Sequence, residues 1–345
     1  MDTKNITRLM ITTAVDRGIK EMADDPKRTL RKLADMGRQF STGRFQPEIF
    51  EVITTILKKE DSPYYKLLQD FIFTTDFNCI KTFGINMGYD SWTYYARVLR
   101  KKSQELGFYI PWVIDFRYEP ADSSHSSIQT KDMQKIIDQA QPLGCNTYCI
   151  LNDGEFSTNT DIYDLFIKNE YCGFFYLLSD AQVTSVQASK LKKAANVLLL
   201  VNADSPNAKD TCQLLHDSGV LFSIYKVYNE EDIDKLSNPE YYNSLLDYHS
   251  GMIFMLKDST CKTSAGPIIK DLRLNQEVPA ILWDLLYDSN LISTILCHSD
   301  CSLRFDNDGS VYSNNDSQLN IINNDIALTD IIKKTMPEFE ETDDK

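Results

Sequence analysis

The spacing of apolar residues changes near residue 110 and divides the chain into two unlike parts. Before that point apolar residues recur three and four positions apart, as at Ile53, Ile56 and Leu57, which is the spacing of an amphipathic helix. We therefore expect helices, and no strand, over the first hundred residues.

Polar residues mark where these helices begin and end. Asp61-Ser62-Pro63 supplies a cap and a first-turn proline for one helix, and Asp90-Ser91 is expected to cap another over residues 92–106. Ser and Asp accept hydrogen bonds from free amides of the first turn, and proline needs no donor there. Gly107 is expected to end the second helix, because glycine adopts the left-handed conformation of a C-terminal cap.

After residue 110 short apolar runs alternate with amphipathic segments. Six runs are expected to be strands: 111–116, 146–151, 173–178, 196–201, 220–228 and 251–256. The segments between them are expected to be helices: 131–144, 159–170, 184–194, 207–219 and 239–249. Continuous apolar strands joined by helices are typical of a parallel sheet that is buried on both faces.

The predicted fold class is therefore α/β, and six repeated units favour an incomplete (βα)6 barrel of the TIM type over a closed barrel of eight units. A doubly wound open sheet is the alternative. In both folds ligands bind at the carboxyl ends of the strands.

The last sixty residues break the repeat. Asp-Gly at 308–309 supplies turn residues with positive φ, so the chain around it is expected to form a hairpin, and a final helix is expected near residues 326–334. The expected organisation is a helical region, a partial barrel, a C-terminal extension and an acidic tail, with these bounds: 1–110, 111–285, 286–336 and 337–345.

Composition excludes several partners and compartments. A formal net charge of −14 opposes binding to nucleic acid or to anionic membranes, because such affinity comes mainly from Lys and Arg. The apolar runs are far shorter than the roughly 20 residues of a spanning helix, and the first twenty residues do not form a signal peptide. We expect a soluble cytoplasmic protein with reduced thiols and a solvated, disordered tail over residues 338–344.

Residues 62–116 resemble the helical lead-in and first strand of a bacterial branch of the radical S-adenosylmethionine (radical SAM) superfamily. The resemblance extends from about residue 20 to 336. It implies a partial barrel in which the first strand opens into a CxxxCxxC loop that binds a [4Fe-4S] cluster, while a Gly-Gly-Glu turn after the second strand meets the methionyl group of the cofactor.

The loop that follows the first strand contains no cysteine. Asp122, Ser123, Ser124 and His125 occupy that region, and oxygen ligands with one imidazole are poor substitutes for the thiolates that hold iron–sulfur clusters. The resemblance therefore implies a degenerate member of the family, without the cluster.

Other cofactor elements of the family are also altered. The Gly-Gly-Glu turn is represented by Asp153-Gly154-Glu155, and the fourth strand has Val201 where the family often has a polar residue. The sequence 303–314 resembles the hairpin of the auxiliary-cluster (SPASM-like) extension, but the expected cysteine aligns near Asn314. Binding of S-adenosylmethionine is left possible and doubtful.

The remaining cysteines offer two weaker metal hypotheses. Cys145 and Cys149 are four residues apart, which on a regular strand places their side chains on one face about 13 Å apart. They are therefore interpreted as buried thiols. Cys297, His298 and Cys301 are zinc-competent residue types, but no fourth ligand is visible, so no metal is expected.

Three side chains are candidates for acid–base or ligand-binding roles at the barrel mouth: His125, Asp153 and Glu155. Asp115 and Arg117, at the end of the first strand, are expected either to pair with each other or to line this mouth. His216 and His249 are expected to be structural.

The leading hypothesis is a radical SAM-like pseudoenzyme that acts as a binding, accessory or regulatory protein, with a peptide, a small molecule or an active radical SAM enzyme as its partner. The alternatives are an enzyme that uses the barrel mouth for non-radical chemistry and a protein that still binds S-adenosylmethionine without iron.

Overall fold

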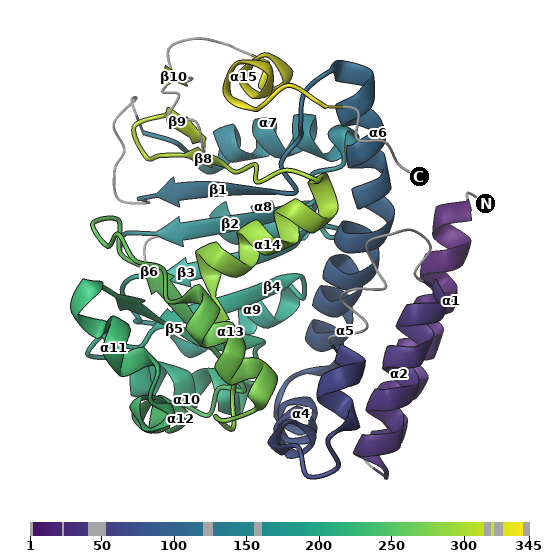
Figure 1. Ribbon diagram of the computed structural model, residues 1–345, viewed down its shortest axis with the longest axis vertical. Coiled ribbons are helices and arrows are strands. Elements are labelled where there is room, and N and C mark those ends of the chain that lie inside the picture. Colours follow the sequence, from purple (N-terminus) through teal and green to yellow (C-terminus); the bar gives the residue numbers. More distant parts are fainter. Residues whose placement is uncertain are drawn as a thin grey trace.

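The computed structural model describes residues 3–22, 24–40, 53–119, 127–154, 161–313, 319–320 and 327–340. Its centre is a mostly parallel ten-stranded sheet with the order β10-β9-β8-β1-β2-β3-β4-β5-β6-β7 (Figure 1). The strands have the following bounds: β1 Val113–Tyr118, β2 Thr147–Asn152, β3 Gly173–Leu178, β4 Val197–Asn202, β5 Phe222–Tyr228, β6 Met252–Lys257, β7 Ile281–Asp284, β8 Leu303–Phe305, β9 Ser310–Ser313 and β10 Leu319–Asn320.

Seven parallel strands, β1 to β7, lie beside one another in chain order. A doubly wound sheet reverses its order at a switch point, so the alternative prediction is wrong. The six predicted strands are confirmed to within two residues at each end. The structure adds β7, which pairs with β6 and begins with the pair Met252↔Ile281.

Both faces of the parallel strands are covered, because successive side chains on a strand point to opposite faces. On the outer face Phe116, Tyr148 and Phe174 are buried in a large apolar cluster. On the inner face Leu177, Leu198 and Phe254 belong to a second cluster. This burial on both faces explains the continuous apolar runs in the sequence.

Four helices cover the outer face, and each connects two neighbouring parallel strands. They are α7 Thr130–Ala140, α8 Asp161–Lys168, α9 Ser185–Lys193 and α10 Ala208–Ser218. Parallel connections are nearly always right-handed, so an unreversed strand order keeps such helices on one side. The predicted helix at 239–249 is helical over residues 239–246, as the 3₁₀ turn η5 Pro239–Tyr242 followed by α12 Asn243–Leu246, and a further short helix, α11 Ile233–Leu236, precedes it.

A long helical rod, made of α5 Phe77–Ile85, the π-helical segment η1 Asn86–Tyr95 and α6 Ala96–Leu106, crosses the amino ends of the strands. Gly107 ends it at φ 81°, as predicted. Asp90-Ser91 does not cap a helix start, because the rod is continuous there. The buried Asp90 carboxylate instead accepts a hydrogen bond from Arg8 Nε at 2.8 Å.

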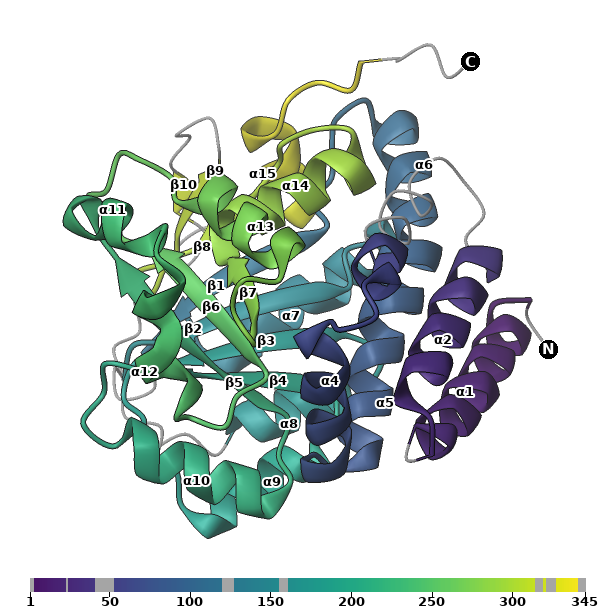
Figure 2. The same cartoon turned by 60° about the horizontal axis from the view of Figure 1, so that its bottom comes forward.

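Arg8 lies on α1 Thr3–Glu21, which packs beside α2 Pro26–Phe40 at the edge of the molecule (Figure 2). Residues 53–58 are also helical. They precede α4 Pro63–Thr74, whose first turn has the predicted cap, since Ser62 accepts from the Tyr64 amide.

The inner side of the sheet is crossed by α14 Leu285–Cys297, which contacts β6, β7 and α6 (Figure 1). It follows α13 Gly266–Asn275 and β7. The Asp284 carboxylate caps α14 by accepting from the Tyr287 amide at 2.8 Å.

The C-terminal extension joins the same sheet. The predicted hairpin is β8–β9, with Gly309 at φ 76°, and β8 pairs in parallel with β1. The final helix is α15 Leu328–Thr335. Residues 338–340 were predicted to be solvated, but Phe339 donates its amide to the Gly107 carbonyl and packs on the Tyr109 ring at 5.3 Å; residues 341–344 lie outside the described residues.

Among the helices that the structure describes, none combines the length and the apolar character needed to cross a bilayer.

Gly144 gives a test of the packing between the rod and the sheet. It has φ 98°, and a β-carbon there would lie 2.5 Å from the Leu99 backbone nitrogen. We expect Gly144→Ala to lower the free energy of unfolding by about 2–4 kcal/mol, measured by urea denaturation. Gly107→Ala is the control, because its φ is also positive but nothing lies within 4 Å; it should cost only about 1 kcal/mol. Equal losses would contradict the packing argument.

Candidate functional site

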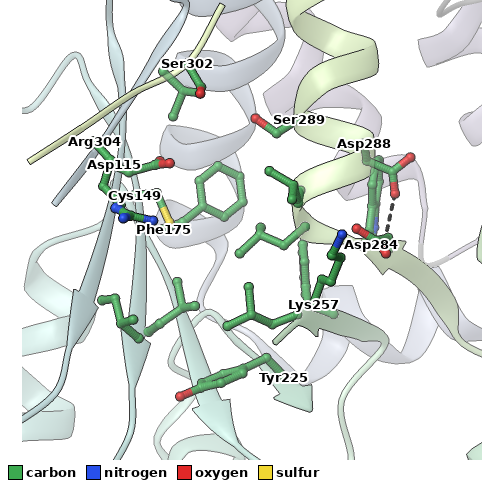
Figure 3. Close-up of a pocket in the computed structure, with 18 of the residues that line it drawn as sticks. Asp115, Cys149, Phe175, Tyr225, Lys257, Asp284, Asp288, Ser289, Ser302 and Arg304 are labelled. Atoms are coloured by element: carbon green, nitrogen blue, oxygen red, sulfur yellow. Dashed lines mark hydrogen bonds between the residues drawn. The ribbon is translucent and has the colours of Figure 1, made fainter. Parts of the chain in front are cut away.

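A cavity of about 930 Å³ lies between the inner face of the sheet, the rod and α14. Inward side chains of β1 to β7 line the cavity, as do Phe83, Met87 and Trp92 of the rod, which we call its floor. In Figure 3, Ser289 of α14 lies across the space from Asp115 and Cys149 on β1 and β2. The lining includes residues at the carboxyl ends of the strands, such as Arg117, Asp153 and Lys257, where ligands bind in folds of this class; we call this end of the cavity its mouth.

The lining is mainly aromatic and aliphatic. Phe175 meets the edge of Phe83 with ring centroids 5.6 Å apart, and Phe254 stacks on Trp283 at 6.2 Å. Leu177 and Leu198 fill the space between these rings. Such a surface suits an apolar body more than a strongly hydrated one.

Asp115 is a carboxyl group deep in this apolar wall. It lies in the middle of β1 and, as Figure 3 shows, projects toward the space between β1 and α14. Burial raises the pKa of Asp115 to about 7, and the charge of Arg304 offsets part of that increase. At neutral pH this carboxyl group is therefore present in both protonation states.

Arg304 does not form an ion pair with Asp115. Its guanidinium group binds Asp306, with Nε 3.1 Å from Oδ1, and lies over the Tyr312 ring at 4.8 Å. Within the part of the chain that the structure describes, no side chain or amide donates a hydrogen bond to the Asp115 carboxylate.

Cys149 is the β2 neighbour of Asp115, since the two Cα atoms are paired in the sheet register. It lines the cavity, and burial, followed by the charge of Asp115, raises the pKa of Cys149 well above its usual range. Cys149 is thus a neutral thiol. Cys145 precedes β2, and its thiol faces the Trp112 carbonyl at 3.5 Å; both residues are free thiols, as predicted.

Of the three predicted acid–base candidates, His125, Asp153 and Glu155, the structure describes Asp153, which lines the cavity. Asp153 is exposed and accepts from Arg117 Nε at 3.2 Å and from Ser179 Oγ at 3.3 Å. Arg117 therefore pairs with Asp153, and the predicted pairing of Asp115 with Arg117 is wrong. Both residues line the cavity, which was the other expectation.

Two of the predicted site residues, His125 and Glu155, lie outside the described residues. Gly154 is described, and its amide donates to Asn152 Oδ1 at 3.1 Å, which closes a turn after β2.

Cys297, His298 and Cys301 lie at the end of α14, remote from the mouth. Both thiols are buried, and the Cys301 thiol packs near Ser293 Oγ at 3.6 Å. His298 ends the helix in the left-handed conformation at φ 60°. The described residues contain no group of three or more His, Cys, Asp or Glu side chains placed to hold a metal ion.

The sequence analysis missed a second pair of carboxylates on the cavity wall, Asp284 and Asp288. Asp284 accepts from Tyr228 Oη at 2.6 Å, and Asp288 accepts two hydrogen bonds from Arg273, at 2.9 and 2.7 Å. Burial raises the pKa of Asp284. Only the position of Asp284 just before an apolar helix pointed to its capping role, and nothing in the sequence pointed to its partners.

Comparisons with known proteins find structural similarity but no match in sequence. No protein-family model matches the chain, and no curated protein matches its sequence. Among solved structures it is similar to Streptococcus suis SuiB bound to S-adenosylmethionine, with a TM-score of 0.48 and 12% identity over 67% of this chain and 66% of that chain, just under two thirds of its length.

Two further structures show similar likeness. SuiB bound to precursor peptide SuiA has a TM-score of 0.48 and 12% identity, covering 67% of each chain. Native anSMEcpe with bound AdoMet and Cp18Cys peptide has a TM-score of 0.42 and 12% identity, covering 65% of this chain and 80% of that chain. We base the functional argument on this chain's own residues.

The raised pKa of Asp115 predicts a pH-dependent stability. A carboxyl group whose pKa is higher in the folded than in the unfolded state costs stability as pH rises from its unfolded value, near 4, to about 7. As pH rises from 5 to 8, we expect the free energy of unfolding of Asp115→Asn to increase by about 1–3 kcal/mol relative to that of the unmodified chain, measured by urea unfolding.

The exposed Asp271 on α13 provides the matched control. Asp271→Asn makes the same change in charge outside the cavity. Its free energy of unfolding should follow that of the unmodified chain over this pH range. If the free energy of unfolding of Asp115→Asn also followed that of the unmodified chain, the pKa of Asp115 would not be raised, and the description of this carboxyl group above would be wrong.

Proposed function

We propose that this chain is a radical SAM-like protein without a [4Fe-4S] cluster, and that it acts by binding a ligand in the barrel cavity. The observation that carries the proposal is a ligand-sized cavity at the carboxyl end of β1, combined with a β1–α7 loop that contains no cysteine. The scaffold supplies a place for a ligand where the thiolates for iron are missing.

The thiols near the cavity do not replace the missing loop. Of the cysteines that the structure describes, two line the cavity, Cys149 on β2 and Cys261 in the loop after β6. Clusters of this type require thiolates, most often several from one loop. The pKa of Cys149 lies far above neutrality and that of Cys261 is also raised, in both cases chiefly by burial. The donor set therefore does not fit the cluster, and we derive no step through it.

The partner is proposed to be a small molecule or a side chain of a peptide, presented at the open end of the cavity, and an active radical SAM enzyme remains a candidate for a larger partner. Nucleic acid is disfavoured by the net charge of −14.

A second candidate function is an enzyme with non-radical acid–base chemistry. Asp115 favours it, because a general acid or base works best with a pKa near the working pH, and its pKa is about 7. In this case Asp115, rather than the predicted group of His125, Asp153 and Glu155, would transfer the proton.

Iron content after anaerobic reconstitution with iron and sulfide tests the leading proposal. We expect much less than one iron per chain and no 5′-deoxyadenosine when S-adenosylmethionine and a reductant are added. Cys149→Ser should leave any adventitious iron unchanged. About four irons and matching sulfide per chain, with 5′-deoxyadenosine as a product, would overturn the proposal.

Calorimetry with S-adenosylmethionine alone tests whether the cofactor still binds. The resemblance aligns Asp153 with a glycine of the family, and the Asp153 carboxylate accepts hydrogen bonds from Arg117 and Ser179, so we expect no measurable heat at millimolar ligand. Saturable heat that is lost in a variant at Gly154 would show that the turn after β2 retains cofactor binding and would move the proposal to an iron-free S-adenosylmethionine protein.

A further inference from the structure

We propose that the ligand of this cavity has an apolar body and a protonated nitrogen, and that the nitrogen binds the Asp115 carboxylate. This inference rests on the proposed binding function and specifies the chemistry of its ligand.

The first support is the hydrogen-bonding capacity that Asp115 leaves unused. Asp115 is partly exposed, to the cavity, and a carboxylate withdrawn from bulk water is normally satisfied by donors, because an unsatisfied charge in such a place is costly. The described residues provide no donor to Asp115, although its side chain faces the cavity. A ligand that brings N–H groups would supply what the protein does not.

The second support is that the nearby cations are already bound to other carboxylates or carbonyls. Arg304 binds Asp306, Arg117 binds Asp153, and Lys257 Nζ approaches the Lys262 carbonyl at 3.4 Å. Their attraction for an anionic ligand is reduced by these partners and, for the exposed Arg304 and Arg117, by solvent.

The other carboxylates of the lining are satisfied by protein groups. Asp288 is bound by Arg273, Asp284 accepts from Tyr228 and from the Tyr287 amide, and Asp258 accepts from Thr260. Among the described carboxylates that line the cavity, Asp115 is therefore the one that still requires a donor. This singles out the β1 side of the cavity as the position of the charged nitrogen.

The third support is the aromatic wall beside Asp115. Phe175 borders the same space in Figure 3, and Trp92 and Trp112 also line the cavity. Trp112 directs its indole N–H to the Ser289 carbonyl at 3.2 Å, which fixes the ring in the wall. Aromatic faces attract cations and bury apolar bodies, so this wall suits an arylalkylamine better than a sugar or a phosphate ester.

The charged and titratable groups beside Asp115 lie on neighbouring strands. Arg304 lies on β8, where it binds Asp306. Burial raises the pKa of Cys149 on β2 and of Cys145 before it far above pH 8, and α14 presents Ser289, which does not ionise. Burial also raises the pKa of Asp284 across the cavity, but that carboxyl group already accepts from Tyr228 and from the Tyr287 amide. Below pH 10 an aliphatic amine remains protonated, so we expect a change in binding between pH 6 and 8 to follow the Asp115 carboxyl group.

A pair of fluorescent probes tests the inference. Dansylcadaverine carries an apolar aromatic body and a primary amine, and N-acetyl-dansylcadaverine has the same body without the charge. At pH 8 we expect dansylcadaverine to bind at least about tenfold more tightly than N-acetyl-dansylcadaverine. Binding is measured by the rise in dansyl emission on titration with protein. The preference should decrease at pH 6, because Asp115 becomes protonated.

Two variants separate the carboxylate from general charge effects. Asp115→Asn should remove the preference for the amine while the N-acetyl probe still binds, and Asp271→Asn, which removes the same charge from the surface of α13, should retain it. If Asp115→Asn fails to fold, the pH dependence of the unmodified chain still decides the question.

The outcomes distinguish the two proposals. Equal binding of both probes at pH 8, or a preference that survives in Asp115→Asn, would overturn the assignment of the basic nitrogen and leave a binding cavity. Tighter binding of 5-(dimethylamino)naphthalene-1-sulfonate, the anionic probe, would do the same and would favour Arg304 and Lys257 as ligand groups. No binding of any of the three probes would overturn the proposed binding function itself.

Discussion

The burial of the parallel strands on both faces is the constraint on which the rest of the structure depends. Helices α7 to α10 cover one face, and their connections follow from the unreversed strand order. That order leaves the other face without crossover helices, although it is equally apolar. The rod and α14 must cover this inner face, and because they span it without filling it, a cavity remains.

Asp115 is an exception to the composition of that inner face. Its strand neighbours in the inward direction are Val113 and Arg117, so one residue lies in the floor and the other reaches the mouth. An ionisable group between them costs stability when charged, as its raised pKa shows. Residues that violate a local rule without a visible structural compensation are often functional, and Asp115 has no structural partner in the described chain that would explain it.

Much of the fold could be predicted because its elements are encoded locally. The six strands, the Asp-Gly hairpin, the Ser62 cap and the Gly107 end depend on residues a few positions apart. The failures depend on distant partners. Asp90 looked like a cap but is held by Arg8 from α1, and β7 is a four-residue strand whose pairing with β6 cannot be read from its length. The covering role of α14 likewise depends on the whole barrel.

The residues that the sequence analysis selected and the carboxylate that the structure draws attention to differ in their depth in the cavity. The candidates predicted from the sequence follow the strands in the chain. Of these, Asp153 is exposed and forms an ion pair with Arg117. The available signal for Asp115 was a single charge inside the apolar run 111–116, which was interpreted as part of the strand end. A strand rises about 3.3 Å per residue, so Asp115 lies roughly 6.6 Å below Arg117.

That difference in depth determines which carboxylate can select a ligand. At the mouth, water and salt weaken the attraction between Asp153 and any cation, and Arg117 already competes for it. Deep in the cavity the same charge acts through a medium of lower effective dielectric constant, where an ion pair is stronger and an unsatisfied group more costly. The selectivity that we propose therefore arises from the wall of the cavity and not from the residues at its mouth.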